Sequence, residues 1–563
     1  MARQISRRQF LRFTAMGAGV TLLASCAPTT GPSSAPASQP AAAGTAASGT
    51  AATSSSGGGT LVLGYPQKTT YGNFCAPWFY AGTQDLYQRR LAYSGLLQWN
   101  NDYSDFLPDL AESWEFDGNQ CTFHLRQDVV WHDGEPFSAD DVIFTFQIIG
   151  HPDSLWTYPE VLQTMVVGFQ EYRDGAAEDI SGITKVDDYT VVFELTQPYR
   201  GPFLNNVASY TINPMHLLNE QPLDALLPEE GLCKTSWALE TGIGTGPFKV
   251  TQYVPDQFIE FTRNDDYYRA EIQLDQIIYT AYTDAQAQAA ALESGECHVG
   301  TIPPSEYPRF QEMTHIDIKL NAGLANTAFF LNTNTIDQKV RQAMWWAIDR
   351  QAIVDSFYHG ATTVPGAIFE YSGFGVGPDV PQYTYDPEMA RSLLTEAGWD
   401  SSRTLRFMVE SIEPASEPLY SLVLGYWQDV GINVEYQVVG ADYGNVQLEP
   451  EGTDILFSGQ VWGADPSEGV RYYLNAPDKF PFIESPEAME ILDAISLSED
   501  QEAIKQGIYQ LQALGSELVT VIPIARSPGI WVINKKVKGD LNPIYALWTR
   551  NDWQWENITV DEG

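Results

Sequence analysis

The sequence predicts an α/β protein with more than one domain. A chain of 563 residues is too long for one compact core, so two or three domains are expected. Its composition, 44% hydrophobic and 12% aromatic, is enough to fill large cores. From Asn332 onward, segments with helical periodicity alternate with short apolar runs typical of strands, which indicates an α/β domain in the second half.

The charge is strongly acidic, with 72 Asp and Glu against 31 Lys and Arg and a net charge of -41. This balance argues against a nucleic-acid partner, whose phosphates need basic side chains. It also disfavours electrostatic docking on anionic lipid. Solubility through self-repulsion accounts for most of the acidic excess.

The N-terminus has the pattern of an export signal. Ser6 to Leu11 reads Ser-Arg-Arg-Gln-Phe-Leu, a twin-arginine motif, and the apolar stretch from Phe13 to Leu23 is too short for an ordinary membrane span. It ends in Leu-Ala-Ser-Cys26, which resembles a bacterial lipobox. We expect residues 1–25 to be a lipoprotein signal peptide and Cys26 to carry the lipid; the alternative is a plain signal peptide with an incidental cysteine.

Residues 26–59 are almost wholly Ala, Ser, Thr, Gly and Pro, a composition expected to form a disordered tether. Its root-mean-square reach is roughly 30 Å. The folded part is expected to start at Thr60. The predicted protein is a body held by lipid to the outer face of the cell membrane.

Four cysteines besides Cys26 leave two possibilities open. Cys75, Cys121, Cys233 and Cys297 could form two disulfides in three pairings, or all could be free. None is close enough in sequence to another for a zinc or redox motif, and the seven histidines are scattered. No metal or cofactor is therefore expected.

In the first half, residues 122–126 alternate like a half-buried strand, and residues 189–195 repeat the pattern. Ser138 with Asp141 forms a capping box for a helix that follows. His132 next to Asp133 suggests acid–base chemistry, but adjacent residues do not orient one another, so catalysis is not expected here. The Gly-x-Gly at 244–246 lacks a nucleotide loop's third glycine and is predicted to be a turn.

The later helices have clear start and stop signals. One is expected over 284–292 and ends at Gly295; another begins at Asp337 and runs to Gly360; a third begins at Asp386-Pro387 and closes at Gly398. A fourth helix is predicted at 501–518. Strands are predicted at residues 405–409, 434–439, 455–457 and 519–525.

One stretch, Asp454 to Pro466, is the best site candidate. It begins as an apolar run that fits a buried strand and ends in Trp462, Gly463 and Asp465. An exposed ring and acid at a strand end can form a ligand site. Locally, an Asp-Pro turn is the alternative.

The chain resembles the solute-binding proteins of bacterial ABC importers, in the group that includes dipeptide- and oligopeptide-binding proteins. The match rests on four segments, 123–146, 245–248, 264–299 and 340–350, the last continued by 385–387 and 393–399. The resemblance implies no enzymatic activity.

The resemblance also implies a fold, a two-lobed α/β structure of the type II periplasmic-binding-protein kind with a hinge of crossing strands. Lobe I would comprise 60–320 and 520–563, with a subdomain inserted at about 100–240, and lobe II would comprise 321–519. Ligand binding would close the lobes, and a membrane permease would recognise the closed form. The receptor is expected to be monomeric.

For the ligand, the resemblance implies a peptide whose α-ammonium pairs with Asp465, with Trp462 and Gly463 at the same strand end. Pro466 follows Asp465 directly, where family members commonly have an Asp-Pro after a Tyr. Weaker candidates are Tyr65, Trp78, Phe79 and the expected hinge at 321–329. An oligosaccharide is the alternative ligand, because 15 Trp would suit stacking on sugar rings. A secreted hydrolase is the alternative of another class, but no motif supports it.

Overall fold

The computed structural model describes most of the chain after the expected tether. The residues described are 58–65, 90–100, 105–152, 160–208, 210–218, 242–254, 257–321, 325–370, 374–409, 416–440, 446–449, 451–461, 466–527, 529–539, 541 and 555–561. No helix in these ranges is both long and apolar enough to cross a membrane.

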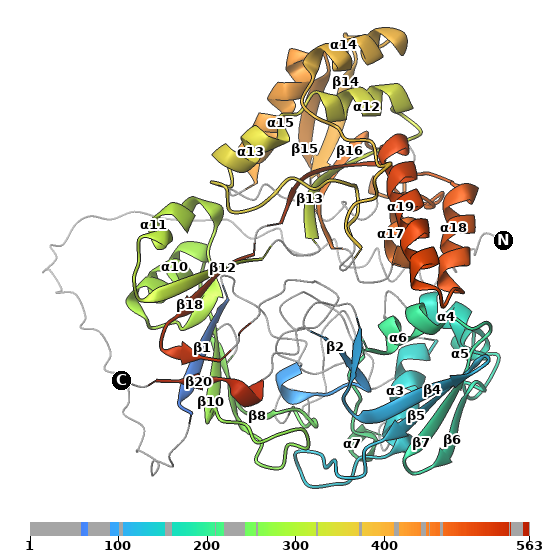
Figure 1. Ribbon diagram of the computed structural model, residues 1–563, viewed down its shortest axis with the longest axis vertical. Coiled ribbons are helices and arrows are strands. Elements are labelled where there is room, and N and C mark those ends of the chain that lie inside the picture. Colours follow the sequence, from blue (N-terminus) through green and yellow to red (C-terminus); the bar gives the residue numbers. More distant parts are fainter. Residues whose placement is uncertain are drawn as a thin grey trace, which may run out of the picture. The chain divides into compact units, whose positions relative to one another are not determined.

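In the described part of the chain, seven strands form one mixed sheet (Figure 1). In spatial order they are β12 (Ile316–Asn321), β18 (Gly529–Asn534), β11 (Val299–Thr301), β1 (Thr60–Tyr65), β10 (Gln276–Ala281), β9 (Phe258–Arg263) and β8 (Phe248–Val254). Strand β1 runs parallel to β10 and β11, while β18 runs antiparallel to β11 and β12. The carboxyl ends of β1, β10, β11 and β12 therefore lie at one edge of the sheet.

Helices α10 (Ala285–Ser294) and α11 (Tyr307–Gln311) pack on this sheet, and the 3-10 turn η1 (Pro304–Glu306) leads directly into α11. Asp284 caps α10 by accepting from the amide of Ala287, and Gly295 ends it in the left-handed conformation. This confirms the predicted start and stop. Smaller pieces complete the region: β2 (Leu97–Trp99) pairs with β3 (Phe106–Pro108), β19 (Val537–Lys538) pairs with β20 (Thr559–Val560), and η3 (Trp555–Asn557) precedes β20.

Four further described strands form an antiparallel sheet with its own core. They are β4 (Ala111–Asp117), β5 (Gln120–Leu125), β7 (Thr190–Glu194) and β6 (Ile183–Asp187), packed with helices α3 (Ala139–Gly150), α4 (Glu160–Met165), α5 (Phe169–Arg173), α6 (Arg200–Ala208) and α7 (Met215–Leu218). The predicted capping box is present at the start of α3. Phe193 centres the core, with ring centroids 5.7 Å from Phe123 and 5.0 Å from Phe146.

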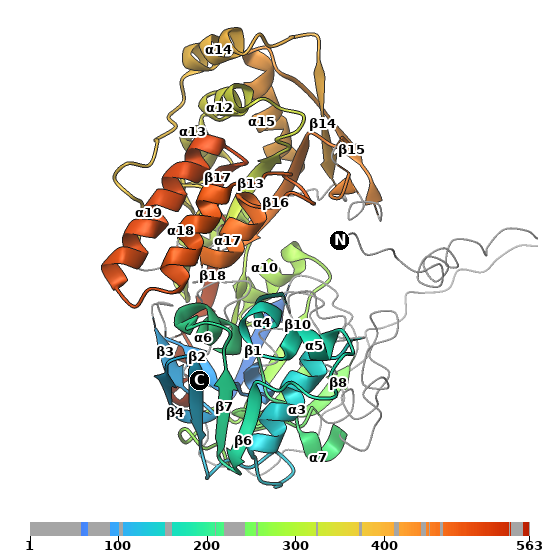
Figure 2. The same ribbon diagram turned by 90° about the vertical axis from the view of Figure 1, so that its right-hand side faces the viewer.

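Five of the described strands form the third large sheet, in the order β15 (Asn433–Val438), β14 (Thr404–Val409), β16 (Ile455–Val461), β13 (Ala325–Leu331) and β17 (Val521–Arg526). Its helices are α12 (Gln338–Trp346), α13 (Arg350–Ser356), α14 (Pro387–Glu396), α15 (Glu417–Asp429), α17 (Pro466–Tyr473), α18 (Pro486–Ser496) and α19 (Gln501–Leu518). The last three lie side by side (Figure 2). Phe329, Phe407 and Trp427 are fully buried in the core.

The chain joins the seven-stranded and five-stranded sheets twice. It leaves β12 at Asn321 and enters β13 at Ala325, and it leaves β17 at Arg526 and enters β18 at Gly529. We call these two connections, residues 322–324 and 527–528, the crossings. On either side of them the same strands are partners, because β12 pairs with β18 and β13 pairs with β17.

The expected boundary at residue 520 is wrong by one strand. Strand β17 lies in the five-stranded sheet, where Val521, Ile522 and Ile524 are buried and the strand pairs with β13. The strand predicted to start at residue 519 starts two residues later, at Val521, because Val519 ends α19 in the left-handed conformation with φ 47°.

The long helix predicted from Asp337 is two helices. Asp337 does cap α12, but the helix ends at Ala347, and Asp349 starts α13 by accepting from the amide of Ala352 at 2.9 Å. An aspartate that caps a new helix competes with continuation of the old one. The break was missed because the apolar periodicity continues through it.

The cysteines described are unpaired. Cys121 and Cys297 carry free, buried thiols, which excludes two disulfides among the four candidates. Burial raises the pKa of both thiols, that of Cys297 to about 12. Each therefore behaves as a small core residue.

Arg341, within one of the segments that resemble the family, is a buried structural anchor. Its guanidinium donates to the carbonyl oxygens of Leu518, at 2.7 Å, and Val519, at 2.9 Å, as well as to that of Ile336. These contacts satisfy the carbonyl groups at the end of α19, which the helix itself leaves unpaired. Burial lowers the pKa of Arg341 to about 10, against the opposing effect of the Asp337 charge.

We predict that Arg341→Lys lowers the free energy of unfolding by about 2 kcal/mol or more, because an ammonium cannot reproduce the planar fork. Urea denaturation measures the loss. Arg391→Lys is the matched control: Arg391 is exposed on α14, and its replacement should change stability by about 0.5 kcal/mol at most. Equal losses in the two variants would contradict the anchor role.

His132 holds the turn at residues 244–246. The amide of Gly244 donates to its Nδ1 at 3.2 Å, so the proton sits on Nε2, which donates to the carbonyl oxygen of Gly246 at 3.0 Å. Desolvation, helped by the nearby Lys249 charge, lowers the pKa of His132 to about 4, although the bond to Gly246 opposes this. The imidazole is therefore a neutral group with a structural role.

This pKa predicts a pH-dependent contribution to stability. The unfolded chain protonates His132 below about pH 6.5, but the folded chain resists protonation until about pH 4, so its contribution falls as the pH falls through this window. His132→Gln cannot titrate. The stability advantage of the wild type over this variant should therefore shrink between pH 7.5 and 4.5 in urea denaturation, whereas a constant difference would refute the assignment.

Candidate ligand-binding site

Three strand ends of the five-stranded sheet meet beside the crossings. In the register of this sheet, Val461 at the end of β16 lies opposite Ala325, the first residue of β13. Asn326 is opposite Gln460 on one side and Arg526, the last residue of β17, on the other. The last residue of β16 therefore lies beside the start of β13, next to the pair formed by Asn326 and the last residue of β17.

The seven-stranded sheet also presents its strand ends at the crossings. Because β1 and β12 point the same way, Tyr65 ends β1 at the edge from which β12 continues toward β13. The ring of Tyr65 stacks on that of Tyr279, with centroids 6.4 Å apart and planes 20° apart. Its carbonyl oxygen accepts from the amide of Tyr282 at 2.7 Å. Tyr65 is thus a partly buried ring at the end of β1, packed against the core of the seven-stranded sheet.

Of the residues predicted from sequence to bind ligand, the structure places Tyr65. The other five lie outside the described residues: Trp78, Phe79, Trp462, Gly463 and Asp465. Cys26, the predicted lipidation site, also lies outside them. Their roles stay predictions, although β16, which leads into three of them, is described up to Val461.

Asp454, the acid that opens the same stretch, has a structural role. Its carboxylate accepts from Arg403 at 3.0 Å and from the backbone amide of Arg406 at 2.8 Å, which ties the start of β16 to β14. Burial alone would raise the pKa of Asp454, but the hydrogen bonds from Arg406 and Thr335 hold it below the usual range. The strand that leads to the candidate site is therefore fixed at its far end.

Sequence reasoning missed a polar cluster beside the crossings. Arg526 forms an ion pair with Glu370, and the Thr362 hydroxyl donates to the carbonyl oxygen of Arg526 at 2.6 Å. The hydroxyl oxygen of Thr327, on the neighbouring strand β13, is 3.4 Å from that of Ser527, which directly follows β17. We call these five residues, with Tyr358, the crossing cluster.

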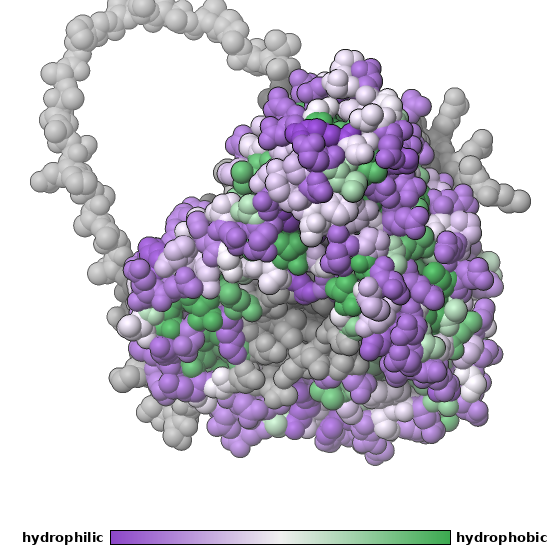
Figure 3. All heavy atoms as spheres, turned by 45° about the horizontal axis from the view of Figure 1, so that its top comes forward, coloured by the Kyte–Doolittle hydropathy of each residue, from purple (hydrophilic) through white to green (hydrophobic). Residues whose placement is uncertain are grey.

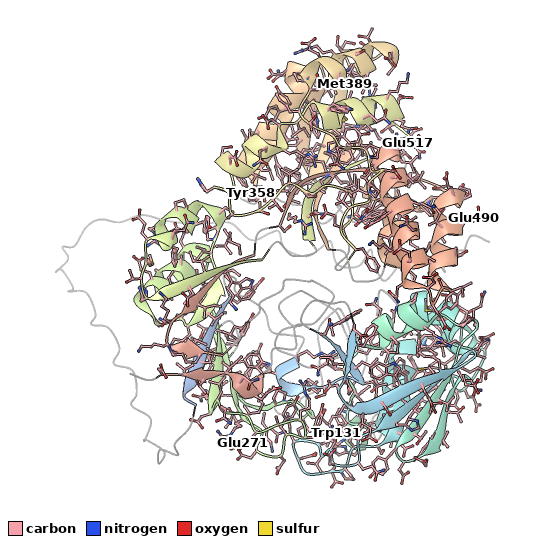
Figure 4. The ribbon with its side chains drawn as sticks, in the orientation of Figure 1. Trp131, Glu271, Tyr358, Met389, Glu490 and Glu517 are labelled. Carbon is pink, nitrogen blue, oxygen red and sulfur yellow. The ribbon has the colours of Figure 1, made fainter. Side chains whose placement is uncertain are left out.

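Tyr358 follows α13 and is hydrogen-bonded to Thr327 on β13. Figure 4 labels Tyr358 in the region between β12 and β13 of Figure 1. Burial raises its pKa to about 12, so the phenol keeps its proton. The hydroxyl groups of the crossing cluster are therefore engaged with one another or with the backbone, and its charges are paired, which ties the chain after α13 to β13 and β17.

A local signal for this cluster exists only in part. The arginine in Ala525-Arg526-Ser527 interrupts an apolar strand, and an arginine at a strand end can mark a site. Its partner Glu370 lies in a distant loop, and no periodicity links the two residues. Only the three-dimensional pairing identifies them together.

Two further features of the described residues are the grouping of possible metal ligands and the character of the surface. Within the described residues, no group of three or more His, Cys, Asp and Glu is arranged to hold a metal ion. Hydrophilic residues cover most of the coloured surface in Figure 3, with hydrophobic ones in smaller patches. This surface agrees with the acidic composition and is typical of a well-solvated protein.

Comparisons with known proteins agree with this architecture. A sequence model described as "Bacterial extracellular solute-binding proteins, family 5 Middle" matches residues 105–480. The dipeptide-binding protein of Escherichia coli strain K12 is 31% identical over 364 residues, which are 61% of this chain and 65% of that protein. Heme-binding protein A of Haemophilus influenzae is 28% identical over 81% of this chain and 86% of its own length.

Among solved structures, the oligopeptide-binding protein AppA of Bacillus subtilis, in complex with a nonapeptide, superposes with a TM-score of 0.72 at 22% identity. The similarity covers 90% of this chain and 99% of AppA. At this identity the likeness shows the fold alone, which is two-lobed. The family match, which covers two-thirds of the sequence, establishes that the chain belongs to family 5 of the bacterial extracellular solute-binding proteins.

Proposed function

We propose that this protein is the substrate-binding lipoprotein of an ABC importer and that it captures a di- or oligopeptide between its lobes. The observation that carries the proposal is the register of β16, β13 and β17: Val461, the last residue of β16, lies opposite Ala325, where β13 begins, and the Trp462–Asp465 stretch follows Val461 in the sequence. A ligand held there would contact both lobes. Relatives that are named for dipeptide and oligopeptide binding support a peptide as the ligand.

Asp465 is the proposed partner of the peptide α-ammonium, with Trp462 and Gly463 beside it. A desolvated charged hydrogen bond of this kind contributes roughly 1.5–3 kcal/mol. On lobe I, the proposed ligand-binding residues are Tyr65, which the structure describes, and Trp78 and Phe79, which lie outside the described residues. Thr327 and Ser527 of the crossing cluster, which are partly exposed, are the proposed hydroxyl partners for the backbone of an extended peptide.

Binding works through lobe closure. Closing brings both lobes onto the ligand, so the ligand shifts the open–closed equilibrium by its difference in affinity for the two forms. The crossings are the connections about which the lobes turn, with lobe II proposed to comprise 325–526 and lobe I the described residues on either side. The permease then receives the ligand from the closed receptor.

The proposal includes export by the twin-arginine route and attachment to the outer face of the membrane through Cys26. The tether at residues 26–59 would keep the receptor near its permease and raise the effective concentration. The ligand-bound receptor acts as a monomer.

We predict that peptides with a free N-terminus raise the melting temperature of the purified protein and that Asp465→Asn weakens their binding about 10- to 100-fold. Calorimetry with a free and an N-acetylated peptide of the same sequence measures the effect, since acetylation removes the charge that Asp465 binds. Asp493→Asn, at an exposed position of α18, is the control and should bind like wild type. Stabilisation by oligosaccharides or heme alone would replace the peptide in this proposal.

We predict that Cys26→Ala releases the receptor from the membrane fraction of expressing cells, because the thiol that takes the lipid is gone. Fractionation followed by immunoblotting measures the shift, and incorporation of a labelled fatty acid should fall to background in the variant. A variant that stays in the membrane fraction and still takes up label would contradict lipidation at Cys26.

A further inference from the structure

An ion pair joins two helical regions that belong to different core clusters. Arg200 begins α6, which packs in the core of the four-stranded sheet, and Glu499 follows α18, which packs in the core of the five-stranded sheet. The Arg200 guanidinium contacts the Glu499 carboxylate at 2.9 Å. Helices α6 and α18 also contact one another along the backbone.

This contact lies away from the crossings, so rotation of the lobes would change the distance between its two charges. In Figure 1, α6 and α18 meet at the right of the picture, whereas β12, which leads into one of the crossings, lies to the left. A rotation about the crossings therefore moves α6 and α18 relative to each other, and opening separates the two charges. A contact near the crossings would be affected far less.

A contact within its own domain orients the Arg200 side chain. Its guanidinium lies over the ring of Phe116 on β4, 5.2 Å from the centroid. A cation–π contact of this kind orients the charge and limits the entropy lost when the pair forms. Glu499 comes from the loop between α18 and α19, so the pair bridges two rigid frameworks.

We infer that Arg200 and Glu499 form an electrostatic latch that stabilises the closed arrangement of the lobes, which deepens the closure mechanism of the proposed function. The two side chains are 38% and 66% exposed, so water screens the attraction and the latch is weak. An exposed pair shifts an equilibrium roughly two- to fivefold. A latch of this strength populates the closed form without preventing release of the ligand.

The test measures the distance between the lobes without any ligand, so its result does not depend on the proposed peptide. Fluorescent labels on ketone-bearing amino acids replace Val186 on β6 and Leu448 in lobe II, both about 60% exposed, and single-molecule energy transfer reports the short-distance population in the full chain. Glu499→Gln should lower the ratio of short- to long-distance molecules roughly two- to fivefold. Raising NaCl to about 0.5 M should do the same in wild type but not in Glu499→Gln.

Two further variants complete the experiment. The charge swap, Arg200→Glu with Glu499→Arg, should restore most of the short-distance population that each single substitution removes. Glu396→Gln is the matched control: it breaks the Lys339–Glu396 pair, also 2.9 Å long, which joins α12 to α14 within one lobe, and should leave the population unchanged. A wild type with no short-distance population, or one that Glu499→Gln leaves unaltered, would overturn the latch.

Discussion

The pairing of two antiparallel strands on either side of the crossings is the constraint on which the rest of the structure depends. Strands β13 and β17 are partners in one sheet, and their continuations β12 and β18 are partners in the other. Backbone hydrogen bonds on both sides fix where each crossing begins and ends. The same register places the ends of β16 and β17 and the start of β13 together, and both the proposed hinge and the proposed ligand site rest on this arrangement.

Three arginines have different roles, which follow from how deeply each is buried. Arg341 is buried and serves the end of a helix, so its loss is costly. Arg526 is partly buried beside the crossings and is paired with Glu370, so its charge is not isolated. Arg200 is exposed and contributes little to stability, which makes it suitable for a reversible contact.

Features that depend on neighbouring residues could be predicted from sequence, and features that depend on distant ones could not. Ser138 with Asp141, and Asp284 with Gly295, mark their helices because caps satisfy backbone groups within four residues. The family resemblance supplied the two lobes. The partners of His132, at 244 and 246, and of Arg526, at 370, arise only when the chain folds back, and the placement of β17 depended on a pairing that its apolar pattern does not specify.

The order of the strands has a consequence for how the chain reaches its native state. The five-stranded sheet is built from one continuous stretch, 325–526, whereas the seven-stranded sheet needs β1 from the start of the folded region and β18 from beyond residue 528. Contacts between segments so far apart in sequence are slow to form because loop closure costs entropy. The continuous lobe can therefore consolidate first, and the discontinuous sheet is completed only when β18 inserts between β11 and β12, which makes that insertion the natural last step of folding.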